Sequence, residues 1–472
     1  MNCLPSLPRC GLWSALLVAM LAGCAGPQHT PPTAPVPERF AHAPDAAADG
    51  LVPANWWQAF GDPVLDRLQA RLELGNQNLQ AAAARVAAAQ AALGTQRAAT
   101  LPVLNGTANA TRSDSGQASL TRQPQNSFSL GATASWELDL WGRLSSGVRA
   151  GEARLAASVG DLDAARLSAR ATLAQTYFTL RAAEAKRAVL EGSVAAYRRT
   201  LALTQARLDV GVAPTSDVLQ ARLQLRDAEV ALLEADTQQA QATHAIAVLL
   251  GTAPSALEAG LAERAALLPA VPGVPALLPA GVIQGRPDIA AAERRLAAAR
   301  WTTEVARTAW WPTLSIGASG GLRSSALDDL MRSPTLFWSV GPSLVQKLFD
   351  GGATRSAIDQ ARAGEDEALA TYRQAVLAAL QEVEDNLVLA RRLADEEVLQ
   401  QASVQDAQRT LDIVQAQYEA GTVGFLNVAA AQVNALSARQ KLLDLQARRL
   451  TAVTVLLRNT AAAPQTLALP RS

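Results

Sequence analysis

Cysteine and histidine are nearly absent from this chain of 472 residues. The three cysteines all lie near the N-terminus, at Cys3, Cys10 and Cys24. The three histidines are His29, His42 and His244. Nucleophilic catalysis with a histidine base and metal sites built from thiolates both need such residues in clusters, which the chain does not offer. The sequence therefore predicts a protein that is not an enzyme and that has no catalytic residue, no metal site and no cofactor.

Net charge and long apolar runs are also absent. Lysine plus arginine and aspartate plus glutamate number 42 each, so no net field favours nucleic acid as a partner. Beyond the N-terminus, no apolar run approaches the length of a membrane-spanning helix. Any membrane crossing must therefore use β-strands. Aromatic residues make up only 4% of the chain, and the abundance of Ala, Leu, Gln, Arg and Glu is typical of long helices and coiled coils.

The N-terminus has the layout of a secretory signal, with Arg9 before a short apolar core and small residues after it. Leu21-Ala22-Gly23-Cys24 resembles the lipobox of bacterial lipoproteins, in which cleavage before the cysteine leaves its thiol to carry a diacylglyceryl group. We therefore expect residues 1–23 to be a signal peptide and residues 24–50 a proline-rich tether with a covalent lipid on Cys24. Ala25 stands where an aspartate would suggest inner-membrane retention, so the outer membrane is the expected destination. The alternative is an ordinary signal peptide with an incidental cysteine.

The rest of the chain contains an internal repeat at an offset of about 210 residues. The matching segments are 78–89 with 288–299, Pro102 with Pro312, and 205–211 with 415–421. Because several matches share one offset and some involve Gly or Pro, they indicate a duplicated unit. We expect a first repeat over residues 51–260 and a second repeat, with an equatorial segment and a C-terminal tail, over residues 261–472.

Each repeat contains segments with the alternation of a membrane strand. Between Phe128 and Leu138, every second residue is apolar and the others are mostly small or polar. The second repeat shows the same alternation from Leu314 to Leu322, and a partner strand begins near Leu336. These segments have the roughly 9–11 residues that a membrane-spanning strand needs. Alternation alone leaves a second possibility open, a pair of soluble hairpins packed on a core.

The helical segments are too long for a compact domain. The expected helices span about 62–99, 145–209, 216–250, 288–310, 354–420 and 426–459, with tight turns at 211–214 and 421–425. A continuous helix over 145–209 reaches roughly 100 Å. The strands of each repeat are therefore expected at one end of long helical hairpins.

Four strands cannot close a barrel by themselves, and an open sheet edge in lipid leaves backbone groups without partners. Three copies of the chain would supply twelve strands and would arrange the helices into a tube by the same symmetry. The predicted fold class is mostly α with a small transmembrane β part. Each chain contributes four strands to a twelve-stranded trimeric β-barrel and long helical hairpins to a periplasmic α-barrel, and it contains two tandem repeats.

Four motifs support a resemblance to a known family. They are Asn55–Pro63 (NWWQAFGDP), Trp136–Arg143 (WELDLWGR), Gly285–Ile289 (GRPDI) and Leu348–Gly352 (LFDGG). The chain resembles the outer-membrane efflux proteins of the TolC type, and within them the lipid-anchored outer-membrane subunits of resistance–nodulation–division efflux systems. The resemblance covers nearly all of the mature chain.

The resemblance implies a homotrimeric exit duct in the outer membrane that extends into the periplasm and conducts small molecules or drugs passively. A periplasmic adaptor protein, an inner-membrane proton-driven pump and outer-membrane lipid are the implied partners. The chain has no phosphate-binding loop of the G-x-x-x-x-G-K-[ST] kind, so it is expected to supply no energy itself. Two alternatives are the exit duct of a type I-like peptide or protein secretion system and a purely structural periplasmic coiled-coil lipoprotein.

The two helical-tip turns form the candidate functional site. The resemblance implies that the adaptor contacts them, at Gly211, Val212, Asp217, Gly421 and Gly424. It also implies that the tip of the second repeat closes the periplasmic end.

The predicted periplasmic gate consists of Phe425, Leu426, Asn427 and Ala430. The family commonly has an inward ring of carboxylates just past this turn, and the matching positions here hold Asn427 and Ala430. The chain departs from that pattern, which leaves cation selectivity and blocking by metal ions unsupported. A hydrophobic constriction of Phe425 and Leu426 can gate by dewetting. Alternatively, these two residues pack between helices and only stabilise the turn. As a separate point, Asp217 at the matching place of the first repeat can still supply charge, although the resemblance implies that its hairpin lies farther from the axis.

Overall fold

The computed structural model describes residues 37–42, 53–114, 124–256, 268–273, 279–332 and 335–460. The chain divides into Met1–Pro35 and Val36–Ser472, and every element described below belongs to the second unit. The predicted signal peptide and Cys24 lie outside the described residues.

One antiparallel sheet contains four strands in chain order, β1-β2-β3-β4. The strands are β1 (Val103–Ser113), β2 (Gln125–Leu138), β3 (Thr313–Ser324) and β4 (Thr335–Val345). In one row across the sheet, Leu130 lies beside Leu322, which lies beside Leu336. Because side chains alternate between the two faces of a strand, this register places most even-numbered residues on one shared apolar face. The alternation predicted from the sequence is thereby confirmed.

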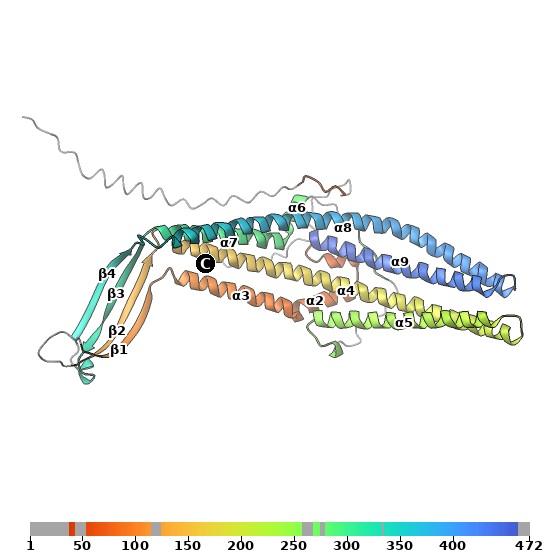
Figure 1. Cartoon of the computed structure of the whole chain (residues 1–472), viewed down its shortest axis with the longest axis horizontal. Helices are drawn as coiled ribbons and strands as arrows, with labels where there is room; N and C mark the ends of the chain where they lie inside the picture. The colour runs from red at the N-terminus through yellow and green to blue at the C-terminus, as the bar shows by residue number, and fades with distance from the viewer. Residues whose placement is uncertain are drawn as a thin grey trace, which may run out of the picture. The chain divides into compact units, whose positions relative to one another are not determined.

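The helices match the predicted hairpins closely. They are α2 (Pro63–Gly75), α3 (Gln77–Ala98), α4 (Arg143–Asp209), α5 (Thr215–Leu249), α6 (Pro279–Gly285), α7 (Pro287–Arg307), α8 (Ala353–Glu419) and α9 (Phe425–Thr460). Both α4 and α8 have 67 residues, so each is roughly 100 Å long. Figure 1 shows the strands at one end of these helices and the α4–α5 and α8–α9 turns at the other. Among the helices that the structure describes, none is both long and apolar enough to cross a bilayer.

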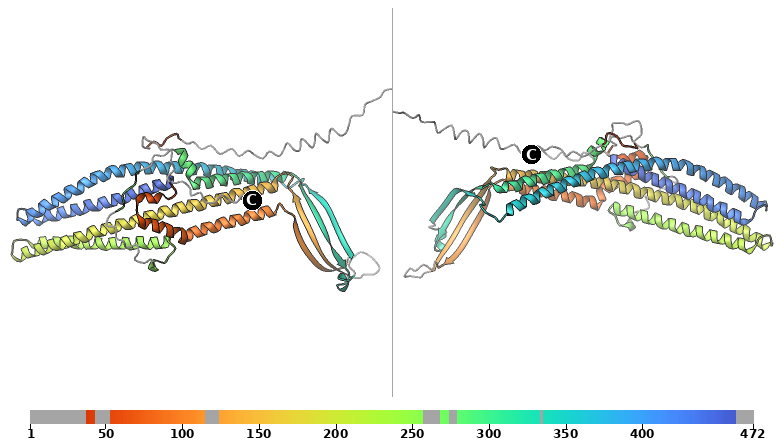
Figure 2. Two further views of the ribbon diagram at one scale, coloured as in Figure 1. Left: turned by 180° about the vertical axis from the view of Figure 1, so that it is seen from behind. Right: turned by 45° about the horizontal axis from the view of Figure 1, so that its top comes forward.

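Neighbouring helices form a wall that continues the sheet. Next to the strands, α3 packs on α4, α4 on α7 and α7 on α8. Toward the tips, α5 packs on α4, while α9 packs on both α8 and α4 (Figure 2). The edges of the wall near the sheet are therefore α3, which precedes the edge strand β1, and α8, which follows the edge strand β4.

The two long helices begin in the same way. Gly142 and Gly352 precede α4 and α8 with φ of 73° and 92°, a left-handed conformation that favours glycine. The Asp139 carboxylate accepts hydrogen bonds from the first amides of α4, and Asp350 accepts one from the Thr354 amide at 2.9 Å. The Thr354 hydroxyl and amide hold the pKa of Asp350 below its usual value. The WELDLWGR and LFDGG motifs thus form the strand-to-helix junctions.

The single helix predicted over residues 62–99 is wrong, because the chain breaks at Asn76. The Asn76 side chain accepts a hydrogen bond from the Leu79 amide at 3.1 Å and so caps α3. It also donates to the Leu249 carbonyl at 2.7 Å. Just before the break, a Cβ on Gly75 would overlap the Leu250 carbonyl. A close backbone crossing with the end of α5 therefore interrupts an otherwise helical pattern.

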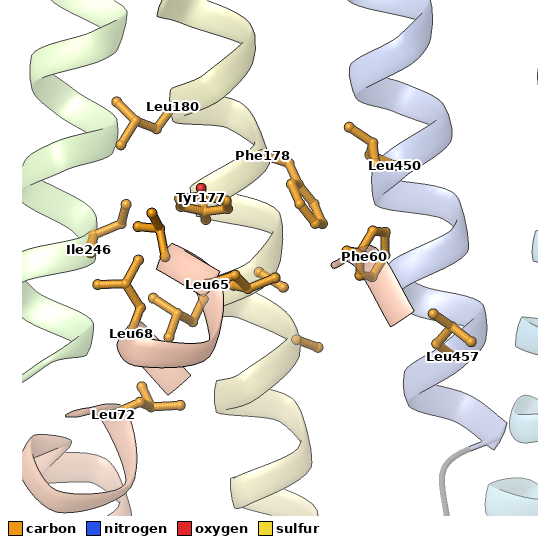
Figure 3. Packing of buried hydrophobic residues seen from close by; sticks show 14 of the residues in the cluster. Phe60, Leu65, Leu68, Leu72, Tyr177, Phe178, Leu180, Ile246, Leu450 and Leu457 are labelled. Atoms are coloured by element: carbon orange, nitrogen blue, oxygen red, sulfur yellow. The ribbon is translucent and has the colours of Figure 1, made fainter. Parts of the chain in front are cut away.

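The main buried core lies midway along the helices and explains the NWWQAFGDP motif. Figure 3 shows Phe60 and Leu65 packed with Tyr177, Phe178 and Leu457. These residues come from the motif, α2, α4 and α9, so the core joins the two repeats.

Asp62 connects this core to a buried polar chain. Its carboxylate caps α2 through the Val64 amide at 2.8 Å and accepts a hydrogen bond from the Tyr177 hydroxyl. Arg181, which is 1% exposed, donates to the same hydroxyl at 2.9 Å and to Glu184 at 2.7 Å. Burial, followed by the Asp62 hydrogen bond, raises the pKa of Tyr177. The motif therefore has a structural role: it packs against the middle of α4 and is hydrogen-bonded to it through Asp62 and Tyr177.

Candidate functional site at the helical tips

Both helical tips are closed by the same type of turn. Gly211 has a φ of 79°, and its amide donates to the Leu208 carbonyl at 2.8 Å. Gly421 has a φ of 78°, and its amide donates to the Tyr418 carbonyl at 3.0 Å. This glycine geometry ends helices because residues with a Cβ are strained there. The two turns are 210 residues apart in the numbering, as the repeat predicts.

The predicted adaptor-contact residues all lie at these turns. Gly211, Gly421 and Gly424 are exposed, and Val212 is 73% exposed. Asp217 is half-buried in the first turn of α5 and is the acidic residue of that turn. The first turn of α9 carries no acidic residue. The surface is therefore accessible, and its role in adaptor binding stays a prediction.

Phe425, one of the two predicted apolar gate residues, is packed inside the helices. It is 1% exposed and contacts a small core that includes Tyr418, Ala221 and Val428. The Tyr418 and Phe425 rings meet edge to face, with centroids 6.0 Å apart. In this conformation Phe425 cannot line an opening, because its ring is covered by its own chain. Its position matches the alternative left open by the sequence, in which this residue packs between helices and stabilises the turn.

Leu426, Asn427 and Ala430 lie on the exposed side of α9. Leu426 is 71% exposed, and the other two are also exposed. Residues three or four positions apart on a helix share a face, so Ala430 continues the surface that Leu426 and Asn427 begin. The tip surface of the second repeat is therefore apolar and neutral at these positions. The gate role of these three residues stays a prediction.

Arg207 and Tyr418 connect the two helical tips. The guanidinium of Arg207 lies over the Tyr418 ring, 4.2 Å from its centroid, and donates to the Glu419 carbonyl at 3.1 Å. The Tyr418 hydroxyl lies 3.4 Å from the Thr204 hydroxyl. This contact was not predictable from the sequence, since each of the two residues occupies an ordinary position on a long helix. The only available signal was an arginine and a tyrosine one turn before matching glycines.

A buried polar layer connects the hairpins farther from the tips. Gln432 of α9 is 5% exposed and accepts a hydrogen bond from the Gln224 amide at 3.2 Å. It donates to the Thr200 hydroxyl at 3.1 Å, and its carbonyl accepts from Tyr197 at 3.3 Å. Burial raises the pKa of Tyr197. Because buried polar groups are costly when unpaired, this layer fixes the register of α9 against α4 and α5.

Glu397 joins α8 to α9 within the second hairpin. It accepts hydrogen bonds from Arg449 at 2.6 Å and from Gln446 at 2.9 Å. Burial by itself would raise the pKa of Glu397, but these hydrogen bonds and the Arg449 charge hold it below its usual value. The hairpin is thereby braced along its own length, while its tip is connected to α4 through Arg207 and Tyr418.

Sequence comparison identifies relatives over almost the entire chain. The profile of the family described as "Outer membrane efflux protein" matches residues 68–252 and 278–461, one segment in each repeat. The chain is 31% identical over 451 residues to the pyoverdine export outer membrane protein OpmQ of Pseudomonas aeruginosa, covering 93% of this chain and 94% of that one. It is 30% identical to the probable efflux pump outer membrane protein TtgC of Pseudomonas putida, covering 93% and 92%.

Solved structures share the fold. The outer-membrane channel OprN superposes with a TM-score of 0.87 at 28% identity, covering 93% of this chain and 99% of that one. The open state of the Neisseria gonorrhoeae outer membrane channel MtrE gives a TM-score of 0.82 at 27% identity, covering 93% and 98%. The predicted fold class and duplication are confirmed. The chain belongs to the outer membrane efflux protein family, and it is an efflux channel of the outer membrane.

Proposed function

We propose that three copies of this chain form the exit duct of a tripartite efflux pump, with a periplasmic adaptor at the helical tips and an inner-membrane proton-driven pump as the energy source. The duct conducts small molecules passively. One observation supports this proposal most strongly: the sheet has one continuous apolar face, yet β1 and β4 each have a single partner among the described strands. In lipid such edges are prohibitively costly, so β4 of one copy pairs with β1 of the next.

The helices support the same closure. Next to the strands, the edge helix α3 is alanine-rich and mostly exposed. Toward the tips, α5 exposes the apolar residues Leu219, Leu223, Val230 and Leu233, and α8 exposes Val398, Leu399 and Ile413. Single chains rarely leave such stripes uncovered along coiled-coil helices. In a ring, the α5 stripe of one copy lies against the α8 stripe of its neighbour.

The adaptor assignment is tested by photo-crosslinking in cells. A photoreactive residue at Val212, in the first tip turn, is expected to capture a periplasmic adaptor protein. The matched control is Leu74, which is 83% exposed on α2, far from the tips along the helices. Capture of an adaptor from Val212 and not from Leu74 supports the proposal. An assembled duct that yields no adaptor from Val212 contradicts the assignment.

The lipid on Cys24 is an auxiliary anchor in this proposal, because the closed strands already hold the trimer in the membrane. The Cys24→Ala variant is expected to lose metabolic labelling with a fatty acid while its trimers remain in the outer membrane. Gels of labelled membranes measure both properties. Label retained by Cys24→Ala would contradict lipidation at this residue.

Leu426 and Phe425 have separable roles at the tip. Leu426→Ala is expected to change the pore conductance with no change in the stability of the trimer, because the side chain is exposed. Phe425→Ala is expected to cost about 3–5 kcal/mol of stability, since it empties a packed site. Planar-bilayer recordings measure the conductance, and the temperature at which the trimer dissociates measures the stability. Unchanged conductance in Leu426→Ala would show that the constriction lies elsewhere.

A further inference from the structure

The face of the sheet opposite the apolar face is polar and almost entirely neutral. It consists of the odd-numbered strand residues, in rows such as Asn105, Thr133, Ser319 and Ser339. The hydroxyl groups of Ser319 and Ser339 share one hydrogen bond across the strands, with 2.8 Å between the two oxygens. The two neighbouring rows contain hydroxyl and glycine positions together with one apolar residue each, Val103 and Phe337. In a membrane-spanning sheet the apolar face contacts lipid, so this neutral face lines the lumen.

Two charged side chains lie on this face among the described residues of β1 to β4: Glu137 and Arg323. Glu137 is at the helix end of β2, where Arg143 donates to both of its carboxylate oxygens at 2.7–2.8 Å. Its charge is therefore compensated within the chain. Arg323 is at the other end of the sheet, in a row with Asn109, Ser129 and Thr335.

The position of Arg323 is set by an aromatic neighbour on the same face. Its guanidinium lies over the Phe337 ring, 5.0 Å from the centroid. Phe337 is opposite Gly321, which has no side chain, so the ring has room beside the β3 backbone. The cation–π contact holds the charge against the lumen face while the side chain stays exposed.

The other charged residues that the structure describes at this end of the sheet lie off the lumen face. Arg112 is an even-numbered residue on the outer face of β1, and Asp114 follows that strand. Asp328, Asp329 and Arg332 are in the connection between β3 and β4, beyond the strand ends. Their opposite signs partly cancel, and salt screens exposed charges within about 10 Å at 0.1 M. Arg323 is thus the uncompensated charge inside the lumen face of the described strands.

We infer that Arg323 and its counterparts in the other copies form a positive ring in the membrane part of the duct, and that this ring gives the duct a preference for anionic solutes. The inference rests on the trimeric duct proposed above and adds its charge preference. Rings of arginine select anions in pores because they raise the local concentration of negative solutes. The absence of an acidic residue from the first turn of α9 leaves no opposing carboxylate ring at that position.

The test is the reversal potential of the pore in planar bilayers under a KCl gradient centred at about 0.1 M, where the exposed charges beyond the strand ends are screened. The wild-type pore is expected to be anion-selective. Arg323→Gln is expected to move the reversal potential toward zero, and Arg323→Glu to reverse its sign. Arg112→Glu changes the same charge at the same end of the sheet on the outer face, and it is expected to leave the reversal potential unchanged.

Each outcome of this experiment is decisive. A cation-selective wild-type pore, or an Arg323→Glu pore with the wild-type reversal potential, overturns the inference and leaves the duct intact as a proposal. An equal shift in Arg112→Glu also overturns it, because the effect would then come from the general surface charge. Failure of the wild-type protein to form any pore contradicts the exit-duct proposal itself. Trimer bands on gels confirm that each variant is assembled.

Discussion

Arg207→Ala is expected to increase the conductance of the duct, because it removes one of the contacts between the two helical tips. The variant loses the stacking of Arg207 on Tyr418 and the hydrogen bond to the Glu419 carbonyl. Together these interactions contribute about 1–2 kcal/mol. If the resting tip depends on them, the ratio of open to closed tips rises about 5- to 30-fold. Single-channel recordings in planar bilayers measure this ratio as the fraction of time spent at high conductance.

The matched control is Arg222→Ala, which removes the same charge from an exposed position on α5 near the tip. It is expected to leave the open fraction unchanged. Tyr418→Phe retains the ring under Arg207 and loses only the hydroxyl near Thr204, so a smaller increase is expected. If Arg207→Ala and Arg222→Ala have the same open fraction, the contact between the tips does not hold the resting conformation.

Gly251→Ala is expected to destabilise the protein severely. Gly251 has a φ of 71°, and a Cβ there would overlap the backbone carbonyl of Gly75. A left-handed conformation costs roughly 1–2 kcal/mol for a residue with a Cβ. Overpacking adds about 1–3 kcal/mol, and here a backbone atom cannot move aside as a side chain would. The expected loss of about 2–5 kcal/mol is measured by chemical unfolding in detergent.

Two other glycines make a graded control series. Gly211 has a positive φ but open space around it, so Gly211→Ala is expected to cost only the conformational strain of about 1–2 kcal/mol. Gly192 is within α4, and nothing lies near its added Cβ. Gly192→Ala is therefore expected to stabilise the helix by about 1 kcal/mol. Equal stabilities of Gly251→Ala and Gly211→Ala would show that the backbone crossing at Gly75 is not tightly packed.

The long helices and their turns were predictable because their signals are local. The absence of proline and the glycines at 211 and 421 predict the C-terminal ends of α4 and α8 to within one residue of where the structure has them. The strands were predictable for the same reason, since alternation along each segment determines which face is apolar. The repeat offset then linked the two halves without any knowledge of their packing.

The contacts between elements were not predictable, because they depend on how the helices are rotated against each other. Asn76 breaks a helical pattern only because the end of α5 crosses it. Phe425 and its neighbour Leu426 are both apolar, and the packing of α9 on Tyr418 decides which of them is buried. Local composition contains no information on that rotation.

The central claim, that the sheet closes between three copies, is tested most directly by disulfides between edge strands. One cysteine replaces Ala108 in β1, and a second replaces Leu336, Trp338 or Val340 in β4, all on the same face of the sheet. Within one chain β2 and β3 separate these positions by roughly 14 Å, too far for a disulfide. We predict that oxidation of at least one pair in membranes gives a ladder of two and then three linked chains that stops at three. A ladder that continues beyond three chains, or no link from any pair in assembled protein, would contradict the account.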